Sequence, residues 1–412
     1  MKLFKKIFFA FVLLIASYCV LLTITFFIPQ HSIESNAEKS LQMVEKEGMY
    51  PSINQGNMLG TRLDNFTDHL MIRKTKADPE LNSLENAMSM ADYPRYWHGY
   101  QLFLRPLLLG MSLGSIRMIY AAILFLLIGL TSYFLTKCSD IYLTTALLIS
   151  LAIGNAATFF FSMQFSNIWI LTLLSVLLFL TKPQLSNTNQ QLFLYFFVIG
   201  SLANFFDLLT TPVISWGIPV IIIYYVTNKY LMDKRSSLSK QVGSFVFTGI
   251  FWGLGYGLTW VAKWILSSII LNKNIVKDAI NQILFRTEGN DKYPLHRLEM
   301  LKSNIRLMYP KVAILLLLIT CLVFLYFAYR KRNSWRPFQL LVLFVLAAVT
   351  PYIWYNILAN HSQIHYWFTY RTQIITSFAI LSAFAFLIPP EKSKDELNYF
   401  GSLSNDVGKE KS

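Results

Sequence analysis

The sequence predicts an all-α fold: a polytopic transmembrane helical bundle of about ten spans with a long first extracytoplasmic loop. Of the 412 residues, 54% are hydrophobic and only 14% are charged, which leaves too few solvating groups to cover a soluble particle of this size. The hydrophobic residues form blocks of about twenty, the helix length that a hydrocarbon layer of about 30 Å requires. Each short connection on the side of the N-terminus carries at least one Lys or Arg, as the positive-inside rule predicts for a membrane protein.

The first apolar block, residues 7–28, resembles a signal sequence, but it exceeds an ordinary apolar signal core and lacks an A-x-A cleavage site. We therefore expect it to be an uncleaved first span. The other nine spans are predicted at residues 115–136, 141–162, 166–181, 191–209, 212–228, 243–271, 311–329, 337–359 and 372–388. The resulting regions are a first transmembrane helix (1–28), an outer loop with amphipathic helices (29–114), a transmembrane bundle (115–271), a second outer loop (272–310), C-terminal transmembrane helices (311–388) and a polar cytoplasmic tail (389–412).

The basic residues assign a side to each connection. Lys2, Lys5 and Lys6 place the N-terminus in the cytoplasm, so we expect every even-numbered connection and the C-terminus there too. These cytoplasmic segments carry Lys137, Lys182, Lys229, Lys234, Arg235, Lys240, Arg330, Lys331, Arg332, Arg336, Lys392 and Lys394. The net charge of +14 therefore needs no nucleic-acid partner. The prediction is a multi-pass protein of the cell membrane with membrane lipids around it.

Two carboxylates in the first outer loop are candidate catalytic groups. Asp64 and Asp68 are four residues apart, which places both on one face of a helix. Clustered anions raise a pKa or hold a cation, and one of them could remove the proton from an acceptor hydroxyl in a sugar transfer. The structural alternative is that Asp64 caps a helix and Asp68 is solvated.

Asp207 is a third candidate, because it follows an apolar span and reaches the predicted outer boundary. A charge at membrane depth is costly, so this carboxylate should contact water or have a partner. The alternative is an interfacial residue that caps the next helix.

Three basic residues could bind phosphate at this side of the membrane. Lys263 lies about eight residues inside the outer end of the seventh span, flanked by Trp260 and Trp264, where an ammonium either snorkels outward or binds an anion. Arg105 belongs to an aromatic-rich run that predicts an amphipathic helix at the interface. Arg371 ends the last outer connection and offers a planar fork for phosphate oxygens, although an interfacial anchor is the alternative.

Histidines add hydrogen-bonding capacity for sugar hydroxyls or phosphate at the same side. His361 and His365 are four residues apart in the last outer connection, and His98 lies in the first outer loop. An HxxxH pair without a nearby Glu is a weak zinc signal, and the three cysteines show no CxxC spacing. We predict no metal site from these residues.

This pattern resembles the C-type glycosyltransferases, which combine many spans, a long first outer loop with an acidic motif, and further outer loops over a lipid-linked donor. The resemblance covers most of the chain and is carried by residues 61–70 with the two aspartates, residues 206–212 (FDLLTTP) and residues 366–371 (YWFTYR). The chain also resembles uncharacterised membrane proteins of Gram-positive surface-polysaccharide clusters.

The resemblance implies a transfer of sugar from a polyprenyl-phosphate donor to a cell-surface glycan or lipid acceptor outside the membrane. It implies that Asp64 or Asp68 acts as base and that Lys263, Arg105 or Arg371 binds the donor phosphate, although the family's acidic pair is usually closer than four residues. This scheme requires no cofactor, and it leaves open whether a divalent cation is bound. The alternatives are a polysaccharide polymerase or ligase and a transporter or flippase of lipid-linked glycans, for which Gly253, Gly255 and Gly257 could permit a broken helix.

Overall fold

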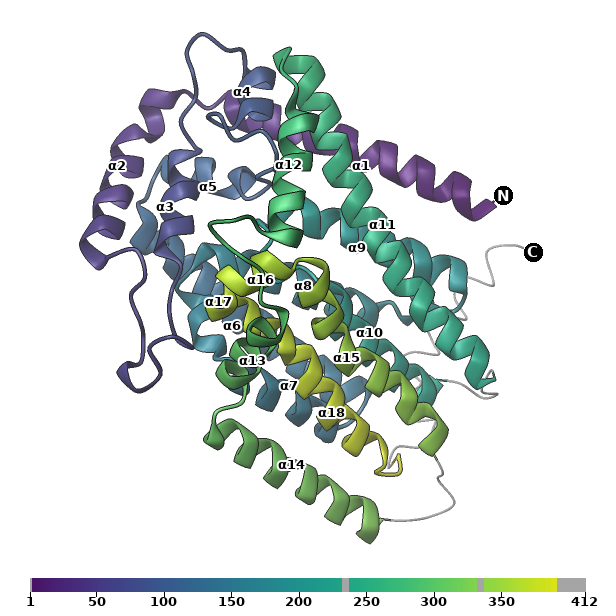
Figure 1. Cartoon of the computed structure of the whole chain (residues 1–412). Helices are drawn as coiled ribbons and strands as arrows, with labels where there is room; N and C mark the ends of the chain where they lie inside the picture. The colour runs from purple at the N-terminus through teal and green to yellow at the C-terminus, as the bar shows by residue number, and fades with distance from the viewer. Residues whose placement is uncertain (1, 232–236, 332–336, 391–412) are drawn as a thin grey trace.

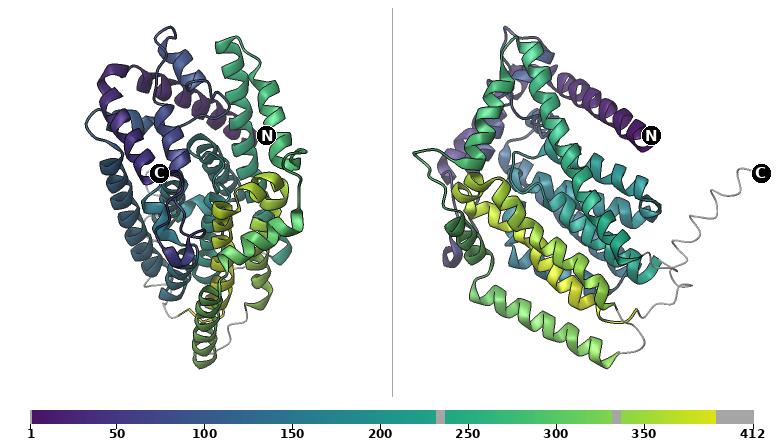
Figure 2. Two further views of the ribbon diagram at one scale, coloured as in Figure 1. Left: turned by 60° about the vertical axis from the view of Figure 1, so that its left-hand side comes forward. Right: turned by 45° about the vertical axis from the view of Figure 1, so that its right-hand side comes forward.

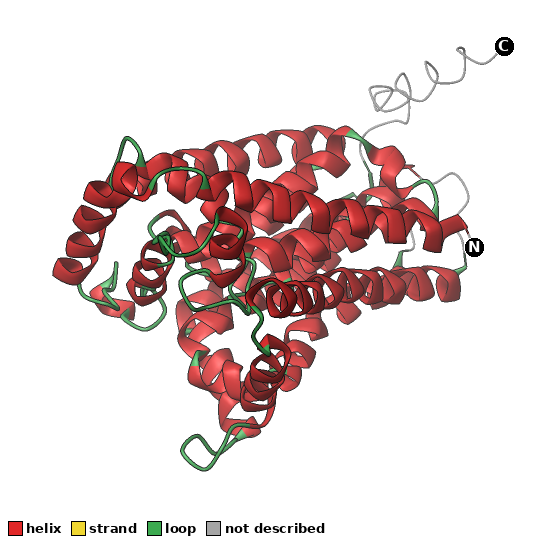
Figure 3. Ribbon diagram, turned by 90° about the horizontal axis from the view of Figure 1, so that it is seen from above, coloured by secondary structure: helices red, strands yellow, loops and turns green. Residues whose placement is uncertain are grey.

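The computed structural model describes residues 2–231, 237–331 and 337–390. These residues form helices joined by turns and loops, with two isolated β-bridges and no strand (Figure 3). The polar tail from residue 391, and the basic residues Lys234, Arg235, Arg332 and Arg336, lie outside the described residues.

A helix occupies each of the ten apolar blocks. They are α1 (Lys2–Phe26), α6 (Leu113–Cys138), α7 (Ile141–Ile153), α8 (Met163–Thr181), α9 (Asn189–Phe206), α10 (Ile214–Val226), α11 (Leu238–Leu271), α14 (Lys311–Arg330), α15 (Leu341–Ile357) and α18 (Ile374–Phe386). Within the described ranges, six helices are long and apolar enough to cross a membrane: α1, α6, α8, α11, α14, and α15 with the short turn that precedes it. Several such helices indicate a membrane protein. The count of ten spans stays a prediction.

The third block departs from its predicted length. We expected residues 141–162 as one span, but α7 ends at Ile153. Asn155 adopts a left-handed conformation (φ 54°) directly after the capping Gly154, and the short 3₁₀ helix η2 (Ala156–Phe160) follows. A left-handed residue stops an α-helix, and Gly and Asn adopt this conformation most readily.

Shorter helices gather at one end of the bundle, which we call the loop end (Figures 1 and 2). The N-terminus of α1 lies at the opposite end. The loop-end helices are α2 (Gln30–Glu47), η1 (Gln55–Asn57), α3 (Asn65–Arg73), α4 (Ser83–Ser89), α5 (Gln101–Leu108), α12 (Ile275–Glu288), α13 (Arg297–Met308), α16 (Ala359–Ile364), α17 (Tyr366–Thr369) and η6 (Tyr370–Gln373).

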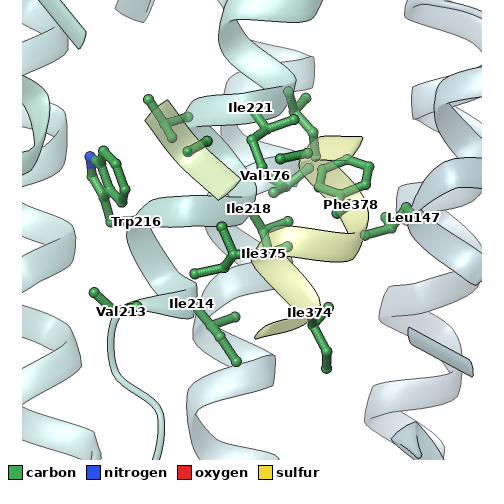
Figure 4. Packing of buried hydrophobic residues seen from close by; sticks show 14 of the residues in the cluster. Leu147, Val176, Val213, Ile214, Trp216, Ile218, Ile221, Ile374, Ile375 and Phe378 are labelled. Atoms are coloured by element: carbon green, nitrogen blue, oxygen red, sulfur yellow. The ribbon is translucent and has the colours of Figure 1, made fainter. Parts of the chain in front are cut away.

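The core lies between α7, α8, α10 and α18. Every residue of α10 is buried, and its Ile218 packs with Val176 of α8 and with Ile375 and Phe378 of α18 (Figure 4). Because α10 is surrounded by protein on all sides, its 13 residues need no amphipathic pattern.

Glycine allows α9 and α11 to pack with their backbones in contact. A Cβ at Gly255 would lie 2.0 Å from the carbonyl oxygen of Phe197, and one at Gly200 would lie 2.0 Å from that of Trp252. Close approach through small residues is a common way for helices to associate in lipid. Helix α11 is continuous from Leu238 to Leu271, so Gly253, Gly255 and Gly257 do not break the helix, and of these three only Gly255 makes a close backbone contact.

An ion pair joins three helix ends at the opposite end of the bundle. Lys229 donates to Asp140 (2.8 Å) and to the carbonyl oxygen of Ala385 (3.1 Å), and Tyr225 and Tyr230 donate to the same carboxylate. The Lys229 side chain is fully buried and that of Asp140 is 14% exposed. The network therefore fastens the α6–α7 connection to the ends of α10 and α18.

We expect Lys229→Met to destabilise the fold by about 3 kcal/mol, because a buried carboxylate loses its counter-ion. Asp140→Asn in the same chain should recover part of the loss, since the charge is then gone as well. The control is Lys302→Met, which breaks an exposed pair with Glu299 and should cost about 0.5 kcal/mol or less. Thermal unfolding of the purified protein in one detergent measures all three, and equal losses for Lys229→Met and Lys302→Met would contradict the assignment.

Candidate functional site

Hydrogen bonds bring three distant segments together at the loop end. Arg371 donates to the carbonyl oxygen of Gly60 (3.0 Å), and His361 contacts the carbonyl oxygen of Leu209 (2.9 Å). The acidic segment of the first loop, the turn after α9 and the last connection are therefore neighbours. This arrangement places several of the predicted site residues in one region: Asp64, Asp68, Asp207, His361, His365 and Arg371.

Asp68 is held by four donors. Its carboxylate accepts from Arg117 (3.3 Å), from the Ser162 hydroxyl (3.3 Å) and from the backbone N–H groups of Met163 and Gln164 (both 3.2 Å). Those amides are the first of α8, where the helix dipole favours an anion. Burial raises the pKa of Asp68, and Arg117 and the amides oppose the shift. With its oxygens occupied, Asp68 serves as an anchor for α8 rather than as a solvated or reactive carboxylate.

Arg117 is the residue that sequence reasoning missed. It also donates to Glu47 (2.8 Å) and to Asn65 (2.7 Å), so one guanidinium joins α2, α3 and α6. A charged residue two positions inside a predicted span was the available signal, because such a residue needs a partner. Its partner Glu47 is 70 residues away in the sequence, and no local pattern connects them.

Asp64 is buried and caps α3. Its two oxygens accept from the Thr67 backbone N–H (3.0 Å) and the Thr67 hydroxyl (2.7 Å). The alternative expectation that Asp64 caps a helix is therefore confirmed. Burial raises the pKa of Asp64 to about 7, while the Thr67 donors and, more weakly, Arg371 lower it and Asp68 raises it. A carboxyl with a pKa near neutrality is suited to accept a proton during catalysis.

Of the predicted phosphate-binding residues, Arg371 is the one that interacts electrostatically with Asp64. It is 1% exposed, and its Nη2 donates to the carbonyl oxygens of Gly60 (3.0 Å) and Arg62 (3.4 Å). Its Nε and Nη1 have no hydrogen-bond partner within the described residues, although the Tyr370 hydroxyl lies beside the guanidinium. The guanidinium stacks over the Phe165 ring at 4.5 Å. Two unused donors on a buried cation give this site the capacity to bind anionic oxygens.

Asp207 and His361 both bond the turn that follows α9. The Asp207 carboxylate accepts from the Thr210 backbone N–H (2.8 Å) and closes the turn after α9. Burial raises its pKa to about 7, and the Thr210 donors oppose the shift. With its proton on Nε2, His361 donates to Leu209, and its Nδ1 accepts from Arg286 (2.8 Å). Burial, His365 and Arg286 lower the pKa of His361 well below its usual range, so it is neutral.

His365 lies against His361, with ring centroids 4.8 Å apart, and stacks on Phe368. Burial and Arg286 lower the pKa of His365 to about 4. Among the described residues there is no group of three or more His, Cys, Asp or Glu side chains that could hold a metal ion.

The structure gives Lys263 a role inside the protein. Its ammonium donates to the carbonyl oxygens of Ala87 (3.2 Å) and Met88 (3.0 Å), which belong to the last turn of α4, and lies over the Trp97 ring. A cation at a helix C-terminus is favourable. Lys263 therefore fastens the first outer loop to α11 and offers no open site for phosphate.

Arg105 and His98 are also occupied internally. Arg105 donates to the backbone carbonyls of Thr25, Ile28 and Thr75, with the first two at 3.2 and 2.7 Å. His98 is hydrogen-bonded to the Tyr100 hydroxyl (2.8 Å), and burial and Lys263 lower its pKa to about 3. Both residues stabilise the first loop. Of the three predicted phosphate-binding cations, only Arg371 has donors that lack a hydrogen-bond partner among the described residues.

An apolar groove of about 510 Å³ opens beside this region, between α5, α6 and α8. Its polar lining groups are Tyr120, whose hydroxyl has no partner within the described residues, and Asn167. The groove runs along residues 119–123 of α6 and 167–174 of α8, and its Tyr120 lies within electrostatic reach of Asp68. Its apolar lining is Leu102, Phe103, Pro106, Leu107, Ile119, Ile123, Ile170, Leu171, Leu174 and Phe206.

Comparisons of the chain with protein-family models, with curated proteins and with solved structures find no match. The function must therefore be inferred from the residues and the geometry of this chain.

Asp64→Asn and Asp68→Asn should differ in their effect on stability. At pH 6 the Asp64 carboxyl is mostly protonated, and Asn is also a good helix cap, so we expect a change below about 1 kcal/mol. Asp68→Asn removes the fully buried one of the two carboxylates that pair with Arg117 and turns an amide toward the N–H groups of α8, which should cost about 3 kcal/mol. Thermal unfolding at pH 6 tests the contrast; an Asp68→Asn protein as stable as Asp64→Asn would remove the anchoring role.

Proposed function

We propose that this protein is an integral membrane glycosyltransferase, which transfers a sugar from a polyprenyl-phosphate donor to a cell-surface glycan or lipid acceptor. The observation that carries the proposal is the pair formed by Asp64 and Arg371. A buried carboxyl with a pKa near 7 lies within electrostatic reach of a buried guanidinium, two of whose nitrogens have no hydrogen-bond partner among the described residues. This combination supplies a base for an acceptor hydroxyl and a binding group for a departing phosphate.

The proposed step is a single displacement with inversion. Asp64 removes the proton from the acceptor hydroxyl while that oxygen forms a bond to the anomeric carbon of the sugar. The bond between the anomeric carbon and the phosphate oxygen breaks, and its electron pair leaves with the polyprenyl phosphate. Arg371 stabilises the negative charge that develops on this phosphate. The proton ends on Asp64, and no oxidant or cofactor is needed.

The apolar groove supports a lipid-linked substrate. Its lining is almost entirely apolar, and it lies between the short helix α5 and two helices that are long enough to span a membrane. An isoprenoid chain in this groove would reach the loop end along residues 119–123 of α6 and 167–174 of α8. Tyr120 and Asn167 would then lie near the polar end of the lipid.

The proposal places the loop end outside the cell, with ten spans and both termini in the cytoplasm. The basic residues of the cytoplasmic connections support this orientation. The four helices below the length or hydropathy of a full span, α7, α9, α10 and α18, are packed among the others, so turns at their ends can complete the crossing.

A flippase is less well supported. Transporters commonly place functional polar groups near the membrane midplane, beside broken helices. Here α11 is unbroken and the polar cluster lies at the loop end. A polymerase or ligase would use the same chemistry with an oligosaccharide donor, and donor specificity separates it from the proposed transferase.

Replacement of Asp64 by Asn and of Arg371 by Gln should each lower sugar transfer by at least about a hundredfold, since a base and an electrostatic stabiliser each contribute about that much. The measurement is surface-glycan composition in the native host, followed by transfer with purified protein in detergent, where transport between compartments cannot occur. Glu299→Gln is the control, because this side chain is exposed and bonds only Lys302 among the described residues. Normal glycan with normal protein levels in both site variants would remove the transferase proposal.

The rate of transfer should rise about tenfold per pH unit below pH 7 and level off above it, because the base must be ionised to accept a proton. The sign for stability is opposite. A carboxyl whose pKa is raised in the folded state stabilises the fold at low pH, and this contribution is lost as the pH rises toward about 7. Asp64→Asn should remove that part of the pH dependence of thermal unfolding.

Asp207 has a pKa near the same value, so the two carboxyls must be separated by mutation. We expect Asp207→Asn to keep the rise in rate near pH 7. If this variant abolishes the rise while retaining measurable transfer, the base is Asp207 and the assignment of Asp64 is wrong.

A further inference from the structure

The segment 49–63 lies between two helix caps. Gly48 ends α2 with φ 87° and has open space around its Cα, and Asp64 begins α3 as its N-cap. A rotation of this segment would turn about Gly48 on one side, where it breaks the hydrogen bond from the Phe66 backbone N–H to the Met49 carbonyl (3.1 Å), and about the Leu63–Asp64 bond on the other. The candidate base itself forms one of these two hinges.

Between the hinges the segment is a preformed unit. Ser52 and Arg62 form an antiparallel bridge, Leu63 donates its backbone N–H to Pro51 (2.8 Å), and the Thr61 hydroxyl bonds the carbonyl of Asn57 (2.8 Å). These internal bonds allow residues 51–63 to move as one body without losing their own hydrogen bonds.

Few contacts hold this unit on the C-terminal part of the chain. The Gly60 carbonyl accepts from the Tyr370 hydroxyl (2.6 Å) and from Arg371 (3.0 Å). The Arg62 guanidinium lies 5.7 Å from the Tyr50 ring centre and 5.6 Å from that of Trp367. These two rings also meet edge to face at 5.3 Å. The aromatic and cation–π contacts among these are individually weak.

The hydrogen bonds of Arg371 show how the segment 49–63 affects this cation. Among the described residues, its Nη2 bonds only the carbonyls of Gly60 and Arg62, which belong to the segment 49–63, and Nε and Nη1 have no partner there. Carbonyl oxygens are neutral acceptors, whereas a phosphate offers charged oxygens in the geometry that a guanidinium binds best. A phosphate and the segment 49–63 therefore compete for the same cation.

We propose that residues 49–63 form a lid over Arg371, and that the phosphate of a lipid-linked substrate replaces the Gly60 and Arg62 carbonyls on this guanidinium when the lid opens. The lid rests on the proposed function, because it regulates access to the same site. In the closed state the backbone occupies Nη2 of the cation, and Asp64 is shielded from water. Opening about Gly48 and Asp64 admits the substrate to both groups at once.

The direct test is to lock the lid. In a chain with Cys19, Cys138 and Cys321 replaced by Ala, Tyr50→Cys and Trp367→Cys are joined by a short bismaleimide that contains a reducible disulfide. The purified full chain in phosphatidylcholine nanodiscs is then assayed for binding of polyprenyl phosphate before and after reduction. We expect the locked protein to bind at least tenfold more weakly, and reduction of the same sample to reverse the loss.

A second test loosens the lid without a cross-link. Arg62→Ala removes the cation from both rings and should raise the affinity for polyprenyl phosphate about two- to fivefold, the shift expected from one exposed cation–π contact. Arg62→Lys keeps the charge over the rings and should leave the affinity near that of the native chain. Arg371→Lys and Arg371→Gln should both weaken binding, which ties the signal to this cation.

The arms of the binding assay separate the sources of phosphate. Competition by inorganic phosphate that depends on Arg371 identifies a site for the free anion, and its absence restricts the site to the lipid. Equal binding of polyprenyl phosphate in the locked and reduced states overturns the lid and leaves the transferase proposal standing. Lid-dependent binding without sugar transfer supports the lid and overturns the transferase. Binding in neither state overturns both.

Discussion

The burial of Arg117 with its acceptors is the constraint on which the loop end depends. A charge removed from water without a partner costs several kcal/mol, so Asp68, Glu47 and Asn65 must be in place together. These residues come from α2 and α3 of the first loop and meet α6 and the first amides of α8. The requirement fixes the loop against two long helices, and the candidate site is thereby built on rigid elements rather than on a free loop.

Asp64 and Asp68 show how far residue spacing alone can predict a site. The spacing of four predicted two carboxylates on one helix face, and α3 indeed carries Asp68 while Asp64 caps it. Their environments decide their roles. Asp68 has a backbone amide donor on each oxygen and a charged donor on one, whereas among the described residues the Asp64 carboxylate accepts only from Thr67. Those donors come from residues 49 to 96 positions away, beyond any local pattern.

Hydropathy located a helix in each of the ten apolar blocks, because apolar length is a local property of the sequence. Helix ends and partners are not local. The end of α7 depends on the backbone conformation of Asn155, and the roles of Lys263 and Arg105 depend on backbone carbonyls up to 176 and 80 residues away. Every residue has a backbone carbonyl, so composition does not show which carbonyls bind a cation. A buried cation that binds carbonyls therefore cannot be distinguished, from the sequence alone, from one that binds phosphate. Arg371 differs because its Nε and Nη1 have no hydrogen-bond partner in the described part of the chain.

The unused donors of Arg371 and the weak contacts of the lid have a common physical origin. A low dielectric strengthens the attraction between a guanidinium and a phosphate, but it also makes the same guanidinium costly to leave without acceptors. Two backbone carbonyls lower this cost without binding as strongly as a charged group would. A cation can then stay buried before the substrate arrives and still prefer the substrate when it does. The same cover keeps water from Asp64, which protects a glycosyl donor from hydrolysis.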